Sequence, residues 1–135
     1  METWYWTPLP KEFHEKCLYV CDFCLHMCVN KTEFLRHSTK CTMRHPPGDE
    51  FYRDGNIAFF EVDGETQKTY SENLCYISKM FLDHKALEGT TAQFFFYVLC
   101  EIREDGYHLV GYFSKNKVMN EFRNNLNCIL VMPFI

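Results

Sequence analysis

Two pairs of metal-ligating residues, separated by a fixed gap, constrain this chain more than any other feature. Cys21 and Cys24 have the spacing C-x2-C, and after twelve residues His37 and Cys41 follow with the spacing H-x3-C. Zinc takes four ligands in a tetrahedron, at about 2.0–2.3 Å. Two cysteines across a tight turn supply two of them, and a histidine and a cysteine four residues apart lie on one face of a helix. The spacing therefore predicts a structural Zn²⁺ site in a Cys-Cys-His-Cys finger.

The remaining cysteines do not form the pattern of a disulfide scaffold. The chain has eight cysteines among 135 residues, below the ~8–10% of small disulfide-rich proteins. The first sixteen residues lack the basic and apolar regions of a secretory signal, so we expect the thiols to be free or bound to metal. Cys17, His26 and Cys28 are spare ligand candidates, and we expect them to fill the core or the surface instead.

The segment between the two pairs predicts a short helix with a scaffold role. Residues 30–33, Asn-Lys-Thr-Glu, have the form of a capping box. Asn30, Glu33 and Arg36 fall where finger helices present base-reading side chains, so a DNA-reading finger is one alternative. Residues 1–50 carry six Lys/Arg against seven Asp/Glu, however, and the whole chain has a formal net charge of −4. Because nucleic-acid binding needs an excess of cation, we do not expect direct DNA binding, and a basic partner suits this charge better.

Downstream of the finger, alternating turns and apolar runs predict an antiparallel sheet. Pro46-Pro47-Gly48 ends the finger, since prolines continue neither a helix nor a strand ladder. Apolar strands are expected at 57–62, 92–100 and 107–113. The Asp-Gly pairs at 63–64 and 105–106 predict hairpin turns, and the first of these implies a returning strand at 66–70.

One helix and one final strand complete the predicted domain. We expect Ser71 to cap the helix, and the helix to end near His84 or Lys85. The final strand, residues 128–132, contains the continuous apolar run 129–131, which is typical of a central strand covered on both faces. We therefore expect its missing cover to come from a longer form of this chain or from another chain.

These patterns together predict an α+β fold in two parts. Residues 1–45 are expected to form an extended aromatic N-terminus and the zinc finger, and residues 46–135 a mostly antiparallel sheet with one main helix. The composition, 47% hydrophobic and 17% aromatic, excludes a disordered chain. No run of about 18 apolar residues is present, so we expect no membrane-spanning segment.

Eight stretches of the sequence resemble one enzyme family, and they occur in that family's order. They are LYVCDFCLHM, HSTKC, RHPPGDEFYR, GNIAFFEVDG, SENLCYISKMFLDHK, FYVLCE, HLVGYFSK and CILVMP. The chain resembles the N-terminal half of the catalytic domain of the MYST-family histone (lysine) acetyltransferases. The resemblance implies a zinc finger packed on a truncated acetyltransferase (GNAT-like) fold, in a nuclear protein. It also implies acetyl transfer from acetyl-coenzyme A to lysines of histone tails. The expected partners are therefore histone tails and the other subunits of chromatin-modifying complexes.

The resemblance also implies roles for particular residues. Cys128 matches the family's active-site cysteine, and Lys85 matches the lysine that members acetylate on themselves. Ile129, Leu130 and Val131 match the strand whose backbone lies along the acetyl and pantetheine part of acetyl-coenzyme A. The four residues of the finger pattern match the zinc ligands. Without the resemblance, Cys128 would be an ordinary strand thiol and Lys85 a cation at a helix C-terminus.

Departures from the family pattern lead to a second hypothesis. In the family, a glycine-rich coenzyme A loop and a helix with a general-base glutamate follow the matched stretches. Val131 stands where members usually have Thr, and residues 88–90 where Tyr-Tyr-Asp is usual. Since a general base contributes ~10²–10⁴ in rate, we expect residues 1–135 alone to be inactive or nearly so. The alternative is a non-catalytic interaction module in acetyltransferase complexes. Direct attack by the lysine amine and a route through acetylated Cys128 both stay open.

Overall fold

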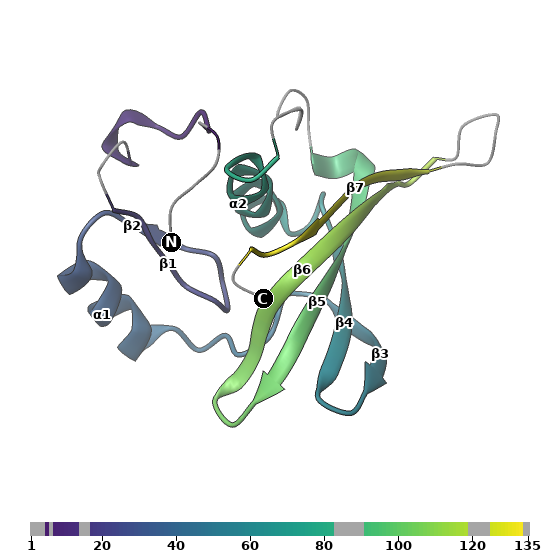
Figure 1. The fold of residues 1–135 in the computed structure, drawn as a ribbon, viewed down its shortest axis with the longest axis horizontal. Helices are drawn as coiled ribbons and strands as arrows, with labels where there is room; N and C mark the ends of the chain where they lie inside the picture. Colours follow the sequence, from purple (N-terminus) through teal and green to yellow (C-terminus); the bar gives the residue numbers. More distant parts are fainter. Residues whose placement is uncertain (1–4, 6, 14–16, 83–90, 119–124, 134–135) are drawn as a thin grey trace.

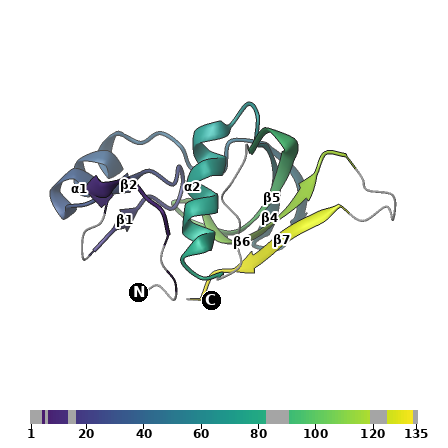
Figure 2. The same cartoon turned by 90° about the horizontal axis from the view of Figure 1, so that it is seen from above.

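A computed structural model of the chain describes residues 5, 7–13, 17–82, 91–118 and 125–133 (Figure 1). The elements in chain order are the 3-10 turn η1 (Lys11–Phe13), β1 (Tyr19–Val20), β2 (Met27–Cys28), α1 (Lys31–Lys40), β3 (Asp49–Asp54), β4 (Ile57–Asp63), α2 (Lys68–Lys79), the 3-10 turn η2 (Thr91–Gln93), β5 (Phe94–Arg103), β6 (Gly106–Asn116) and β7 (Leu126–Val131). Two perpendicular views place α2 between the finger elements, β1, β2 and α1, and the large sheet (Figures 1 and 2).

The finger has almost no apolar core of its own. β1 pairs with β2 in antiparallel fashion, with Tyr19 opposite Cys28. The predicted cap of α1 is confirmed, because the backbone N–H of Glu33 donates to Asn30 Oδ1 at 2.8 Å. No residue of α1 is buried. A ten-residue helix without a buried face is marginal in water, so this helix needs a different source of stability.

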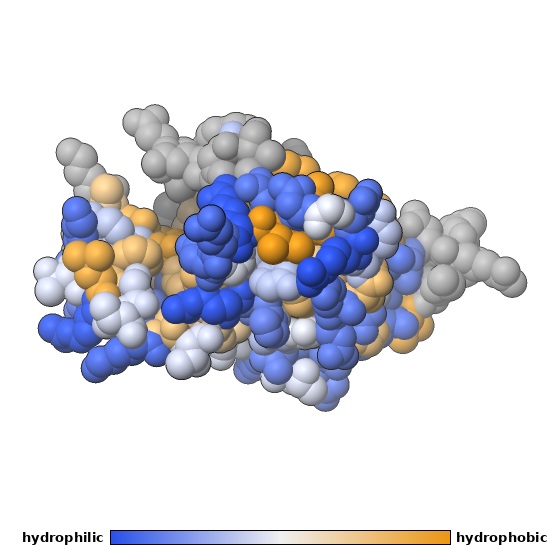
Figure 3. Space-filling model, turned by 90° about the horizontal axis from the view of Figure 1, so that it is seen from below, coloured by the Kyte–Doolittle hydropathy of each residue, from blue (hydrophilic) through white to orange (hydrophobic). Residues whose placement is uncertain are grey.

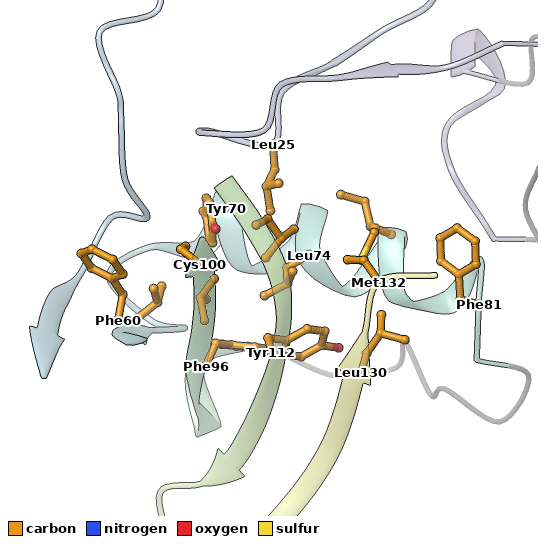
Figure 4. Close-up of a cluster of buried hydrophobic side chains, with 14 of the residues drawn as sticks. Leu25, Phe60, Tyr70, Leu74, Phe81, Phe96, Cys100, Tyr112, Leu130 and Met132 are labelled. Carbon is orange, nitrogen blue, oxygen red and sulfur yellow. The ribbon is translucent and has the colours of Figure 1, made fainter. Parts of the chain in front are cut away.

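The five-stranded sheet is antiparallel throughout, in the order β3-β4-β5-β6-β7. Burial alternates along β4, where Ala58, Phe60 and Val62 are buried and their neighbours are not. The buried face packs against α2 through Leu74 and Ile77, in one apolar cluster that also includes Leu25 of the finger (Figure 4). The finger, α2 and the sheet therefore share a single core.

The segment after β4 differs from the sequence prediction. Asp63-Gly64 does not turn the chain into a strand at 66–70, because that segment leads into α2, whose N-cap residue is Gln67. Asp63 stabilises this entry, since its Oδ1 accepts from Glu65 N–H at 2.9 Å and its carbonyl oxygen accepts from Gln67 N–H at 2.9 Å. Ser71 is not a cap but a fully buried residue inside α2.

The end of α2 and the last strand also differ from expectation. The helix ends at Lys79, short of the predicted end. The first strand of the sheet, β3, was missed because all six of its residues are exposed and it carries no apolar alternation. The expectation of a central final strand is wrong for the described residues, since β7 pairs only with β6 and is an edge strand. One face of β7 is covered, and the other is not.

The predicted α+β class is confirmed by these elements and by the cysteine–histidine cluster of the finger. The exit from the finger at Pro46-Pro47-Gly48 and the β5–β6 hairpin at Gly106 lie where the sequence placed them. Among the described residues, no helix is long and apolar enough to cross a membrane.

Candidate metal centre and coenzyme strand

The four residues of the finger pattern lie together in space. One ligand atom from each of Cys21, Cys24, His37 and Cys41 falls within 4.8 Å of the others. Cys24 Sγ is 3.2 Å from His37 Nε2. Cys21 and Cys24 come from the turn between β1 and β2, and His37 from the last turn of α1, whose C-cap residue is Cys41. Three thiols and one imidazole are a donor set that zinc takes in tetrahedral structural sites, so these residues fit the ion.

Burial favours the protonated form of the Cys24 thiol and the neutral form of the His37 ring. Burial, and then the charge of Cys21, raise the pKa of the Cys24 thiol to about 12, although a backbone hydrogen bond from His26 opposes them. Burial, and then the neighbouring His26, lower the pKa of His37. His37 is therefore neutral near pH 7, as a metal ligand must be, and a bound metal would displace the thiol protons.

The spare candidates named from the sequence do not belong to this cluster of four. Cys17 is exposed, and Cys28 is buried in β2 opposite Tyr19. His26 is exposed, and its ring stacks on the His37 ring with 4.7 Å between centroids. His26 therefore packs against a ligand candidate, and its ring supports the orientation of His37.

A second contact joins the finger to the β5–β6 hairpin. His108 Nδ1 lies 2.8 Å from Asp22 Oδ2, and His108 Nε2 lies 2.6 Å from Asp105 Oδ1. The Phe23 ring of the finger also packs against the His108 ring, with 5.0 Å between centroids. The turn that holds Cys21 and Cys24 is thus fixed to the tip of the sheet as well as to α2. The sequence assigned no role to His108, because its partners are distant along the chain or lie in an ordinary turn.

Cys128 lies on β7 with its sulfur directed to the covered face of the sheet. The thiol is half-buried, and Sγ is 3.5 Å from the hydroxyl oxygen of Tyr112 on β6. Burial, and then the charge of Cys128, raise the pKa of Tyr112 well above its usual value, so the phenol stays neutral. Sequence patterns could not indicate this partner, because it depends on which residues of β6 and β7 lie opposite each other, Tyr112 facing Leu130 and Ser114 facing Cys128.

The three residues after Cys128 alternate between the two faces of the sheet. Leu130 is 7% exposed and packs in the core with α2, whereas Ile129 is 64% and Val131 58% exposed. Because β7 is an edge strand among the described residues, its outer backbone groups have no neighbouring strand to pair with. Lys85, the other site residue named from the sequence, lies outside the described residues.

The uncovered side of the sheet is an aromatic face. It consists of one residue from each strand of the sheet, in the order of the strands: Phe51, Phe59, Tyr97, Phe113 and the aliphatic Ile129. Tyr97 and Phe113 stack with 4.9 Å between centroids, and Phe51 meets Tyr97 edge-on at 5.4 Å. Ile129 continues the row, since it is the strand partner of Phe113. Figure 3 views the molecule from below relative to Figure 1, and on that side separate hydrophobic patches lie between hydrophilic residues.

Comparison with known proteins identifies the family. Residues 1–41 match the MYST family zinc finger domain, and residues 45–135 match the MOZ/SAS family. The chain belongs to the MYST family. Among its relatives, "Histone acetyltransferase of the MYST family 2" of Arabidopsis thaliana is 50% identical over 134 residues, which is 98% of this chain and 30% of the relative.

Other relatives of this MYST chain come from fungi and animals. "Histone acetyltransferase esa1" of Emericella nidulans is 52% identical over 98% of this chain and 26% of its own length. "Histone acetyltransferase Tip60 homolog" of Caenorhabditis elegans is 47% identical over 98% of this chain and 29% of its own length. The MYST chain thus spans less than a third of the length of these relatives.

Proposed function

We propose that this MYST chain forms the N-terminal part of an enzyme that transfers acetyl groups from acetyl-coenzyme A to histone lysines. The observation that carries the proposal is β7, an edge strand with Cys128 on its covered face and an unpaired outer backbone among the described residues. Such a backbone can hydrogen-bond to the amides of the pantetheine arm along Ile129, Leu130 and Val131. Family membership and the names of the relatives support the same reaction.

In the proposed reaction a neutral lysine amine attacks the thioester carbonyl carbon directly. The carbon–sulfur bond of acetyl-coenzyme A breaks, an amide bond forms, and the coenzyme leaves as the thiol after taking up the amine's proton. A route through acetylated Cys128 is the alternative. Its sulfur faces the core and the Tyr112 hydroxyl, whereas Ile129 and Val131 occupy the uncovered face. Lys85 is proposed as a site of self-acetylation.

In this proposal the finger is a structural zinc site. Cys21, Cys24, His37 and Cys41 would hold one Zn²⁺, whose chemistry here is to crosslink the β1–β2 turn to α1. The observation that supports the ion is a helix without a single buried residue that nevertheless brings two of the donors together. Binding energy of a structural zinc ion contributes directly to folding.

Charge and family membership guide the proposed partners. Histone tails are cationic, and the chain has a formal net charge of −4. Long-range electrostatic attraction therefore favours the encounter of the chain with a histone tail. We propose a nuclear location and association with other subunits of chromatin-modifying complexes. Direct DNA binding is not proposed, because no excess of cation is found in the finger segment.

Residues 1–135 alone are proposed to have no measurable acetyl transfer. Neither described helix is preceded by a glycine-rich loop of the kind that binds a pyrophosphate at a helix N-terminus.

A non-catalytic module within acetyltransferase complexes is the second candidate, favoured by the exposed aromatic face. Capture of other complex subunits from nuclear extract by this chain, lost when Phe113 and Tyr97 are changed to Ser, would distinguish that role.

A chimera tests the enzymatic proposal. Residues 1–135 replace the aligned residues of the Emericella nidulans relative, which is 52% identical to this chain over 134 residues. The chimera is expected to acetylate histone peptides, while residues 1–135 alone are not. A folded, zinc-loaded chimera without activity would contradict the assignment. Turnover by residues 1–135 alone that Cys128→Ala abolishes would contradict the predicted inactivity.

A further inference from the structure

Residues 21–26, which we call the cysteine loop, form a closed turn that carries two of the four metal-ligand candidates. The Leu25 N–H donates to the Cys21 carbonyl oxygen at 2.9 Å, and the Cys21 N–H donates to the His26 carbonyl oxygen at 3.0 Å. Leu25 is 1% exposed and has a φ of +63°. Because leucine rarely adopts this left-handed conformation, contacts with the rest of the molecule must hold the loop in it.

The helix α2 provides the first of these contacts. The side-chain amide of Asn73 donates to the carbonyl oxygen of Leu25 at 3.1 Å. Figure 4 shows Leu25 pointing from the finger toward α2, where it joins the core that includes Leu74. A buried carbonyl needs a hydrogen-bond partner, and here the partner comes from outside the finger. Asn73 therefore fixes the backbone of the residue that directly follows Cys24.

The β5–β6 hairpin provides the second contact, on the opposite end of the loop. Asp22 and Phe23 are the two residues between the ligand cysteines, and both contact His108, the first through its carboxylate and the second through its ring. The hairpin tip approaches closely as well, since a Cβ built on Gly106 would lie 2.9 Å from Phe23 Cε1. The cysteine loop is therefore held between α2 and the sheet.

The helix α1, which carries the other two ligand candidates, has much weaker support. None of its residues is buried, and a ten-residue helix of this kind is marginal in water. Its aromatic contacts lie within the finger, where Phe34 stacks on Tyr19 with 5.7 Å between centroids. A pocket of about 240 Å³ lies between α1 and the hairpin, lined on one side by Phe34 and Ser38 and on the other by His108. Figures 1 and 2 show α1 at the outer end of the molecule, away from the sheet.

We infer that Asn73 and His108 are positioning residues of the metal site, which hold the cysteine loop in its ligating conformation before a metal binds, and that zinc then orders α1. The inference rests on the proposed zinc site. Cys21 and Cys24 form a preformed half-site, and the ion recruits His37 and Cys41 to it. Since a preformed loop loses little conformational freedom on binding, removing either contact lowers the affinity for zinc.

Amide hydrogen exchange of the 135-residue chain, with and without zinc, tests this order of events. Without metal and in the presence of a reductant, the N–H groups of Cys21 and Leu25 are expected to stay protected, because their acceptors lie within the fixed loop. The amides of α1 are expected to exchange rapidly, and one equivalent of zinc to slow them about 10-fold or more. A cysteine loop that becomes protected only when zinc is added would overturn the inference. An α1 that is already protected without zinc would do the same.

Asn73→Asp tests the contact itself, because it keeps the size of the side chain and removes the amide donor. The affinity for zinc, measured by competition with a chromophoric chelator, is expected to fall about 10-fold. The Leu25 amide is expected to lose its protection in the metal-free variant. Ile77→Val is the matched control, since it trims a buried residue one turn further along α2. This control should weaken the core and leave the affinity for zinc unchanged.

His108→Ala keeps the test decisive if the Asn73 variant loses its fold, which amide exchange in β5 would reveal. It removes the contacts with Asp22 and Phe23 and is also expected to lower the affinity for zinc about 10-fold. Unchanged affinity in the folded variants of Asn73 and His108 would overturn the inference, and so would an equal loss in Ile77→Val. A wild-type chain that binds no zinc would overturn the zinc site itself.

Discussion

His108 of the β5–β6 hairpin forms an ion pair with Asp22 of the finger, with 2.8 Å between His108 Nδ1 and Asp22 Oδ2. The other ring nitrogen meets Asp105 at 2.6 Å. Carboxylates accept and do not donate, so both nitrogens carry protons when both bonds are formed, and the ring is a cation. The junction between finger and sheet is therefore sensitive to pH.

The stability contribution of His108 should fade as the pH rises. Burial alone would lower the pKa of His108, but the hydrogen bonds to Asp105 and Asp22 and their charges raise it above its usual value of 6.5. A raised folded-state pKa stabilises the fold fully below about pH 6.5, and the contribution is lost as the pH rises through the folded-state pKa. Urea unfolding of the wild type and His108→Gln from pH 5.5 to 8.5 should therefore show a difference that shrinks with pH. A difference that is constant across this range would refute the assignment.

Gly106 should tolerate alanine far less well than Gly55, although both have a positive φ. A Cβ built on Gly106, where φ is +141°, lies 2.8 Å from the Arg44 carbonyl oxygen and 2.9 Å from Phe23 Cε1. A Cβ on Gly55, where φ is +59°, meets nothing within 4 Å. We expect Gly106→Ala to cost about 1–3 kcal/mol or more and Gly55→Ala about 1 kcal/mol. Equal unfolding free energies for the two variants would show that the finger does not pack against the hairpin tip.

The final strand should respond to substitution on one face only. Leu130 packs in the core with α2, so Leu130→Ala should cost about 2–5 kcal/mol in unfolding free energy. Ile129 is 64% exposed, so Ile129→Ala should change stability by less than about 0.5 kcal/mol. Denaturant titrations of the two single variants make this comparison. A large loss for Ile129→Ala in residues 1–135 would mean that the aromatic face is already covered.

The sequence predicted the finger well, because the spacing of the ligands and the helix cap act over short stretches of the chain. The spacing of Cys21, Cys24, His37 and Cys41 leaves few arrangements that bring all four donors together, and the Asn30 cap acts over three residues. The β5–β6 hairpin at Gly106 was equally predictable, since a turn with positive φ strongly favours glycine.

The sequence failed where tertiary contacts decide the structure. Asp63-Gly64 has the composition of a hairpin turn, but here Asp63 binds the chain that enters α2. Ser71 resembles a cap and is instead buried in the core. The partnership of Tyr112 with Cys128, and the buried hydroxyl of Tyr70, depend on which strands and helices meet, which periodicity does not encode.

X-ray absorption of the zinc-loaded chain tests the central claim, that a metal held by four finger residues stabilises the fold. We expect one zinc ion per chain with three sulfur ligands and one nitrogen ligand, and Cys24→Ser should lose the ion together with the structure of α1. Cys17→Ser is the control and should keep both, because Cys17 is exposed and lies outside the cluster. A folded chain that binds no zinc, or a shell of four sulfurs, would contradict the account.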